Sequence, residues 1–265
     1  MSVITFPEGE IFRYNNEKSN RSGMNSHHFH DLFEVYYMAS GTCHYFIDDK
    51  SYDVLEGDVV LIPESVIHKT KYDGAEHRRM LIECSAHFIP ENVRDRLKAM
   101  VHLYRNISVT KEIYTIIKKI EEEVKAPDEF TADALRSLMK LLFFCLMRNK
   151  NTLRLGESKN PTVENIVEYV KKNYNSDITL SSVAKEHFLS PEHLSRIFKR
   201  DTGFGFNEFL TLVRLQRAEA MLKNRGKRSI SEIAYSCGFN DSNYFSDKFK
   251  RVHGISPLKF SKNFE

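Results

Sequence analysis

Two histidines and a glutamate near the start of the chain have a spacing that suits a metal or ligand site. They are His28, His30 and Glu34 in the segment HHFHDLFE, and His68 follows at the end of GDVVLIPESVIH. Side chains at even spacing along a β-strand point to one side, so we expect the first three, with Tyr36, to face one interior. Imidazole and carboxylate groups suit manganese, iron, nickel or zinc. They also suit hydrogen bonds to a polar organic ligand.

The composition of the chain is that of a soluble globular protein. Of its 265 residues, 41% are hydrophobic and 28% are charged, which excludes a disordered chain. The longest apolar run, at 141–147, is far shorter than the ~20 residues of a membrane span, and the first residues show no signal-peptide pattern. The four cysteines are widely separated (Cys43, Cys84, Cys145, Cys237). This spacing favours reduced thiols in the cytoplasm.

The first 90 residues are typical of short strands. Runs rich in β-branched and aromatic residues, separated by turn residues such as SGT, DDK and EGD, are VYYM (35–38), HYFI (44–47), VVLIP (59–63) and MLIEC (80–84). Several short strands at this spacing predict a small barrel or sandwich.

A helical hairpin is predicted after Pro90, over residues 110–149. Two apolar stripes with helical spacing flank Pro127-Asp128, and they are formed by Ile113, Ile116, Ile117, Ile120 and Val124 and by Leu135, Leu138, Leu142 and Leu146. Two such helices cannot bury both apolar faces alone. They pack on the barrel, on a second copy of the chain, or on both.

The second half of the chain contains an internal repeat. VAKEHFLSPEHLSRIFKRDTG (183–203) aligns with IAYSCGFNDSNYFSDKFKRVHG (233–254), which has one extra residue at the turn. Each copy predicts a short helix, a tight turn and a second helix, with Ser190-Pro191 and Ser229 as helix starts. Such units place their second helix in a DNA major groove.

Charge is distributed in agreement with this prediction. Residues 161–265 carry 17 Lys and Arg against 12 Asp and Glu, whereas residues 1–160 carry 22 against 24. A basic second half beside a mildly acidic first half indicates that the second half binds a polyanion.

The second half resembles the DNA-binding domain of AraC/XylS-type transcription regulators. The resemblance is carried by LSSVAKEHFLSPEHLSRIFKRDTG, RLQRAEAML and SISEIAYSCGFNDSNYFSDKFKRVHGISPLKF. In that family a long helix, here matched by residues 206–224, joins two helix-turn-helix units whose recognition helices reach successive major grooves. The resemblance implies double-stranded DNA as a partner.

By position, the resemblance implies two sets of DNA contacts. Arg196 suits guanine O6 and N7, and Asn243 suits adenine. Asp247 stands where the family often has Arg, so this helix either reads cytosine N4 or contributes less to specificity. The base-facing residues are Glu192, His193, Ser195 and Arg196 in the first unit and Ser242, Asn243, Ser246 and Asp247 in the second. The phosphate contacts are Ser190, Lys199, Arg200, Lys248, Lys250 and Arg251.

Residues 20–90 resemble a cupin barrel. The first cupin motif is matched by Gly23, His28, His30, Glu34 and Gly41, and the second by Gly57, Pro63 and His68. Ser65 stands where the second motif usually has Gly, and Tyr72 where it usually has Asn. Cupins that bind metal use the two His, the Glu and the later His as ligands. Sensor domains of AraC-type regulators commonly bind a small organic effector in such a barrel.

The sequence therefore predicts an α+β protein of two domains. Residues 1–150 form a cupin-like effector-binding and dimerisation domain, 151–160 a linker, and 161–265 an all-α domain with two helix-turn-helix units joined by a long helix. We expect a cytoplasmic, homodimeric regulator of transcription, neither an enzyme nor membrane-bound, without a cofactor. Its effector is sugar-like, and the residues that contact it are His28, His30, Glu34, Tyr36 and His68.

Two alternatives stay open. One is a metal-dependent cupin enzyme fused to a DNA-targeting module, with metal at His28, His30, Glu34 and His68. The other is a regulator that has no small-molecule effector. Nothing in the residues separates activation from repression.

Overall fold

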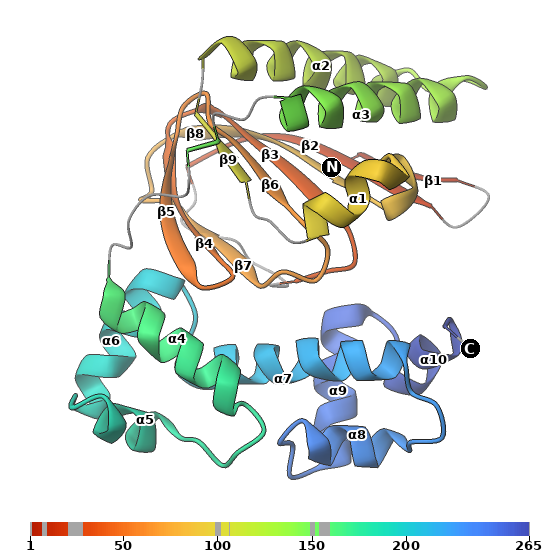
Figure 1. Ribbon diagram of the computed structural model, residues 1–265. Helices are drawn as coiled ribbons and strands as arrows, with labels where there is room; N and C mark the ends of the chain where they lie inside the picture. The colour runs from red at the N-terminus through yellow and green to blue at the C-terminus, as the bar shows by residue number, and fades with distance from the viewer. Residues whose placement is uncertain are drawn as a thin grey trace.

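The protein consists of a β-rich domain that sits on an all-helical domain (Figure 1). The computed structural model describes residues 2–6, 10–20, 29–98, 102–105, 107–148, 152–153 and 160–264. Most of the predicted linker, as well as Gly23 and His28, lies outside these residues. None of the described helices combines the length and the apolar character needed to cross a membrane.

Antiparallel strands make two facing sheets in the first domain. The strands are β1 (Ser2–Thr5), β2 (Ile11–Ser19), β3 (Phe33–Ser40), β4 (Thr42–Ile47), β5 (Lys50–Leu55), β6 (Val59–Ile62), β7 (His68–Lys71), β8 (His77–Cys84), β9 (His102–Tyr104) and β10 (Thr152–Leu153). Within the described residues, the larger sheet has the order β1-β2-β8-β3-β6-β9-β10 and the smaller one β5-β4-β7. All four predicted strands are confirmed.

Alternation along β3 and β6 explains why these strands are apolar on both faces. Phe33, Val35, Val59 and Leu61 pack with the helical hairpin on one face of the larger sheet. Tyr36 in β3 and the alternate residues of β6 point the other way, into the barrel interior. A sheet that is covered on both faces needs a nearly continuous apolar run.

The helical hairpin packs on the outer face of the larger sheet (Figure 1). Its helices are α2 (Ile107–Lys125) and α3 (Thr131–Arg148). The buried stripes are the predicted ones, although Leu138 is only partly buried. An ion pair and a hydrogen bond join the hairpin to β2 and the residue before it: Arg136 lies 2.9 Å from Glu10, and the Asn16 amide donates to Glu121 at 3.0 Å. Of the two partners left open by the sequence, the barrel therefore covers the apolar stripes.

Two details of the first domain differ from the prediction. A short helix, α1 (Glu91–Lys98), follows the 3-10 turn η1 (Ala86–Phe88), where no helix was predicted. In addition, the strand expected to include His28 and His30 begins only at Phe33. Residues 29–32 leave the sheet because Phe29 and Asp31 contact the second domain.

The second domain has the two helix-turn-helix units that the repeat predicted. Its helices are α4 (Pro161–Asn173), α5 (Leu180–Glu186), α6 (Pro191–Thr202), α7 (Phe206–Lys223), α8 (Ile230–Ser236), α9 (Ser242–His253) and α10 (Pro257–Lys262). The predicted caps are present: Asn160, Ser190 and Ser229 each accept a hydrogen bond from the first turn of their helix. Helix α7 joins the units, and apolar residues are buried all around it.

The turns of the two units differ at one backbone position. Gly238 has a φ of 84°, and a Cβ there would lie 2.9 Å from the Asn175 Cα and from the Tyr174 carbonyl oxygen. Phe188 occupies the matching position in the first unit with a φ of 57°, and its side chain is exposed. At this position the backbone of the second turn lies against the residues that follow α4, whereas Phe188 in the first turn faces solvent.

We predict that Gly238→Ala destabilises the protein by about 3 kcal/mol, because the left-handed backbone and the contact with α4 both oppose a side chain. Gly226→Ala is the control: its φ is 57°, but nothing lies within 4 Å of its Cβ position. It should cost about 1 kcal/mol. Thermal denaturation of both variants measures the difference, and equal losses would show that the close approach is not a constraint.

Candidate DNA interface and sensor site

The predicted base-facing residues of the first unit lie along one exposed face of α6. Glu192, His193, Ser195 and Arg196 are all exposed, while Leu194, Ile197 and Phe198 are buried beneath them. The guanidinium of Arg196 lies 3.0 Å from the Nδ1 of His193, one helical turn earlier. Helix α6 thus presents an exposed polar surface with the guanidinium of Arg196 at its centre.

The second unit presents a different surface on α9. Asn243 and Asp247 are exposed, but Ser242 and Ser246 are half-buried. The Ser246 hydroxyl donates to the carbonyl oxygen of Ser242 at 2.8 Å, so this proton is already used in a hydrogen bond within the helix. Asp247 pairs with Arg251 at 3.2 Å. This ion pair offsets the charge of the carboxylate, and sequence reasoning had not predicted it.

The residues predicted to contact phosphates lie at the N-cap of α6 and in the C-terminal halves of both recognition helices. Ser190, Lys199, Arg200, Lys250 and Arg251 are exposed, and Lys248 is half-buried with its ammonium 5.2 Å from the Tyr244 ring centre. Arg200 is paired with Asp201 at 2.6 Å. The positive charges therefore lie at the exposed ends and edges of the helices that carry the base-facing groups.

In the sensor domain, the structure brings together three of the predicted effector-contacting residues. The Nε2 atoms of His30 and His68 lie 3.5 Å and 3.4 Å from Oε2 of Glu34. One ligand atom from each of the three residues lies within 4.8 Å of the others. His30 reaches Glu34 from the loop before β3, and His68 reaches it from the start of β7.

Backbone carbonyls orient both imidazole rings of this cluster. The Nδ1 atom of His30 lies 3.0 Å from the Leu32 carbonyl oxygen, and that of His68 lies 2.8 Å from the carbonyl oxygen of Val66. Each Nδ1 therefore carries a hydrogen, which leaves the Nε2 lone pairs aimed at the Glu34 carboxylate. Lone pairs facing an anion require a cation between them, either protons or a metal ion. Buried Glu34 Oε2 and His68 Nε2 have no hydrogen-bond partner, so the residues fit such a group.

The electrostatics of the cluster follow from this arrangement. Burial alone would raise the pKa of Glu34, but the rings of His68 and His30 hold that pKa well below its ordinary value. For His30, burial lowers the pKa, yet Glu34 and then Glu83 outweigh burial and raise it. The cluster is thus polarised toward a carboxylate and an imidazolium.

Tyrosines extend this cluster into the barrel interior. The Tyr45 hydroxyl donates to Oε1 of Glu34 at 2.5 Å. Tyr36 does not touch the cluster directly, and its hydroxyl lies 3.1 Å from that of Tyr72 and 3.5 Å from the Cys43 sulfur. The predicted effector-contacting set is therefore brought together only in part: Tyr36 lies behind Tyr45, and His28 lies outside the described residues.

Sequence reasoning missed two members of the site. Glu83 lies 3.3 Å from His30 and stands opposite Glu34 in the β3–β8 register. A glutamate inside the apolar run MLIEC was the signal that could have identified it. Tyr45, in HYFI, carried no comparable signal because aromatic residues are common in buried strands.

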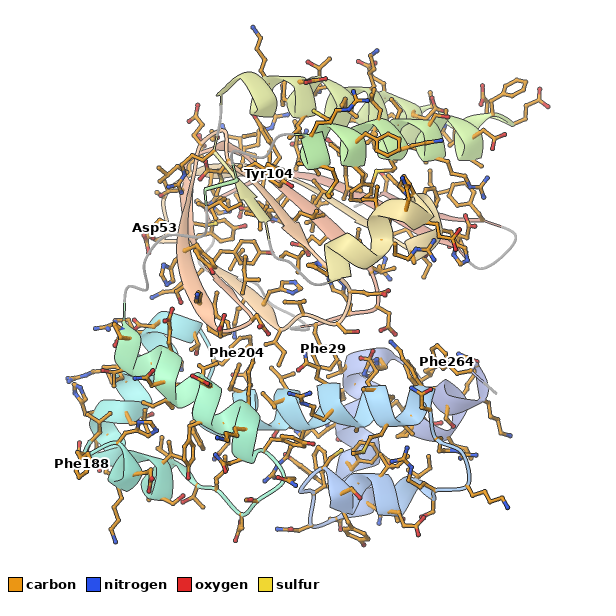
Figure 2. The ribbon with its side chains drawn as sticks, viewed as in Figure 1. Phe29, Asp53, Tyr104, Phe188, Phe204 and Phe264 are labelled. Atoms are coloured by element: carbon orange, nitrogen blue, oxygen red, sulfur yellow. The ribbon has the colours of Figure 1, made fainter. Side chains whose placement is uncertain are left out.

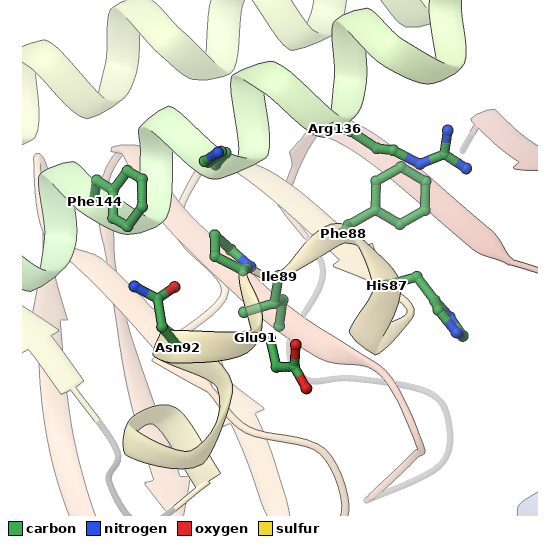
Figure 3. Close-up of a pocket in the computed structure, with 9 residues that line it drawn as sticks. His87, Phe88, Ile89, Glu91, Asn92, Arg136 and Phe144 are labelled. Carbon is green, nitrogen blue, oxygen red and sulfur yellow. The ribbon is translucent and has the colours of Figure 1, made fainter.

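A separate hollow lies between the start of α1 and helix α3. Figure 3 shows Phe88 and Arg136 side by side at one end of it, with Asn92 and Phe144 at the other. Its volume is about 500 Å³ and it is open to solvent. None of the predicted site residues lines this hollow.

Two family models match the chain. An AraC-like ligand binding domain matches residues 16–139, and a helix-turn-helix domain matches residues 183–263. The chain belongs to the AraC-type transcription regulators. Both the sensor cluster and the paired recognition helices lie inside the matched segments of this DNA-binding regulator.

Curated relatives cover nearly the whole AraC-type chain. The transcriptional activator RhaR of Mannheimia succiniciproducens is 23% identical over 246 residues, which are 89% of this chain and 87% of RhaR. The Msm operon regulatory protein of Streptococcus mutans is 26% identical and covers 96% of this chain and 93% of its own. Among solved structures, ToxT from Vibrio cholerae aligns over 95% of this chain and 97% of ToxT, with 17% identity and a TM-score of 0.41.

We predict that the sensor cluster makes stability depend on pH. The raised pKa of His30 gives stability that is complete below its ordinary value of 6.5 and is lost as pH rises through the folded value. The lowered pKa of Glu34 gives stability that is lost as pH falls below 4.5. In chelator, His30→Gln should therefore lower the melting temperature more at pH 6 than at pH 8.5. An equal loss at both pH values would contradict the charged pair.

Proposed function

We propose that this AraC-type regulator binds DNA through both recognition helices of one chain. The observation that carries the proposal is that α6 and α9 are held by one helix, α7, with all four predicted base-facing residues of α6, and Asn243 and Asp247 of α9, exposed. Arg196 reads guanine, Asn243 reads adenine, and flanking cations contact phosphates. The side chains proposed for contact with DNA are those predicted from the sequence.

We further propose that the sensor domain binds a small polar effector at the His30, Glu34 and His68 cluster. A buried carboxylate beside two imidazoles suits a ligand with hydroxyl groups, such as a sugar, because hydroxyls both donate and accept hydrogen bonds. Tyr36, behind Tyr45, is proposed as a more distant contact in the same interior. The names of the curated relatives favour an activator. Such a protein acts in the cytoplasm and catalyses no reaction.

Dimerisation through the helical hairpin is the remaining part of the proposal. Tyr114 on α2 and Leu141 on α3 are exposed although the predicted stripes are buried against the barrel. A second copy covering them would join two double recognition units and multiply their DNA affinity.

A divalent metal ion is the second candidate occupant of the sensor cluster. The observation that favours it is the pair of Nε2 lone pairs aimed at Glu34, whose buried Oε2 has no hydrogen-bond partner. His30, Glu34 and His68 would hold the ion, which would supply a Lewis acid. Glu83 lies 3.3 Å from the same Nε2 atom of His30, so it adds negative charge on the ion's side of the ring, while the Leu32 carbonyl orients the ring through Nδ1. This candidate keeps the alternative of a metal-dependent cupin enzyme open.

We predict that Arg196→Ala weakens binding to a selected DNA site by about 1–3 kcal/mol and relaxes the preference at one base pair. Lys250→Ala should weaken selected and random DNA alike, and it should lower the salt slope by about one. The measurement is a binding titration at several salt concentrations, with a duplex selected from random sequence by the full chain.

Lys119→Ala is the matched control for these variants. Lys119 is exposed on α2, on the far side of the sensor from the recognition helices, so its loss changes net charge alone. Its affinity should equal that of the wild type. Equal losses of selected and random DNA for Arg196→Ala would remove this residue from base recognition.

The occupant of the sensor cluster is tested on protein purified without a histidine tag. We predict that at least one sugar in a panel of sugars and organic acids raises the melting temperature, and that His68→Gln abolishes this rise. Elemental analysis should find no stoichiometric metal, and chelator should leave the melting temperature unchanged. One metal ion per chain that is lost in Glu34→Gln would establish the metal candidate instead.

A further inference from the structure

The two recognition helices carry an aromatic ring at the same position of their first turn. His193 is the third residue of α6 and Tyr244 the third residue of α9, and the internal repeat aligns them. The backbone amide of His193 donates to the Ser190 hydroxyl at 3.2 Å. That of Tyr244 donates to the Asp241 carboxylate at 2.6 Å. The helix caps therefore fix both rings at equivalent places near the helix starts.

The first turn of α6 lies away from the sensor. Figure 2 shows Phe188, in the turn before α6, on the side of the helical domain opposite the barrel. The other end of α6 faces the sensor, since the Asp201 carbonyl accepts from the Ser51 hydroxyl at 2.5 Å. Helix-turn-helix units bring the N-terminal residues of the recognition helix to the base edges. His193 thus stands at the end of α6 that meets DNA.

In α6, the ring contacts the cation that is predicted to read a base. The Nδ1 atom of His193 lies 3.0 Å from the guanidinium of Arg196. A guanidinium has only N–H donors, so Nδ1 accepts and the ring is neutral with its hydrogen on Nε2. Side chains on a helix lean toward its N-terminus. The contact therefore holds Arg196 in the direction of the bases.

In α9, the ring contacts a cation that is predicted to bind phosphate. The ammonium of Lys248 lies 5.2 Å from the ring centre of Tyr244, which is within cation–π range. The Tyr244 ring is itself supported, because its centre lies 6.3 Å from that of the buried Phe239 in the turn before α9. Lys248 is therefore also held toward the start of its helix.

Packing explains why the cation stands at a different step in each helix. Residues three and four positions apart are neighbours on a helix surface. In α6 the fourth residue after the ring, Ile197, is buried, so the cation is the third, Arg196. In α9 the third residue, Asp247, pairs with Arg251 at 3.2 Å, and the cation is the fourth, Lys248. Both helices thus combine a ring in the first turn with a cation one turn later.

We propose that His193 and Tyr244 are positioning residues, which hold Arg196 for base reading and Lys248 for phosphate contact. Long cationic side chains lose rotamer freedom when they bind DNA, and a ring that holds them beforehand reduces this loss. His193 therefore acts on sequence preference through Arg196, whereas Tyr244 acts on affinity for any DNA through Lys248. The inference rests on the proposed DNA contacts of these two cations.

The role of His193 is tested by a double-mutant cycle in the full chain. His193→Leu should weaken binding to selected DNA about five-fold, the value of one ordinary hydrogen bond, and relax the same base pair as Arg196→Ala. Added to Arg196→Ala, it should cause no further loss, because the ring has no cation left to hold. His193→Gln should retain most of the affinity, since its amide oxygen can accept from the guanidinium. His87→Leu, at an exposed histidine of the sensor, is the matched control and should bind like the wild type.

A second cycle tests Tyr244. Tyr244→Leu should weaken selected and random DNA alike by about three-fold, the value of an exposed cation–π contact. It should cause no further loss when added to Lys248→Ala. Tyr244→Phe keeps the ring and should bind like the wild type. If Tyr244→Phe loses as much as Tyr244→Leu, the hydroxyl contacts DNA directly and the positioning role of this ring is wrong.

The outcomes separate positioning from DNA binding itself. Arg196→Ala and Lys248→Ala alone test the proposed DNA contacts, whereas only the two cycles test the rings. Losses that add in both cycles would overturn the inference, even if both cations are established as DNA contacts. Melting temperatures are measured for every variant. Where a leucine substitution lowers the melting temperature, His193→Met or Tyr244→Met replaces it, and the same cycle decides.

Discussion

The burial of α7 is the interaction on which the rest of this structure depends. Both helix-turn-helix units pack on it, and its remaining side is closed by the sensor, so that even Glu219 is buried. A helix with apolar residues on every side cannot be stable on a protein surface. Its burial therefore fixes the spacing between α6 and α9 and gives the sensor direct contact with the element that sets this spacing.

The sensor meets this constraint through strand alternation. In the larger sheet, alternate residues pack against the hairpin and fill the barrel. Near the helical domain, His30 and His68 face Glu34, whereas the residues next to them in sequence contact the helices. One stretch of chain can in this way contact a ligand and a second domain at once, with no additional structural element between them.

Much of the fold could be predicted from the sequence, because it is encoded in local patterns. The helix caps at Asn160, Ser190 and Ser229 and the stripe around Ile117 are such patterns. The contacts between the two domains could not be predicted from the sequence. Phe29, Asp31 and Ser65 contact residues about 150 or more positions away, and no periodic pattern in the sequence marks them. The late start of β3, at Phe33, follows from the same long-range contacts. Glu83 lies beside His30 because the register between β3 and β8 places it opposite Glu34, and strand register cannot be read from composition.

The central claim is that α7 holds two recognition helices that read DNA together. The most direct measurement is methylation protection of guanine N7 atoms, in the major groove, on a duplex selected by the full chain. The account predicts two protected clusters about one helical turn, ~10 base pairs, apart on one face. Inserting half a turn between them should abolish tight binding. A single protected cluster, or affinity that survives the insertion, would contradict it.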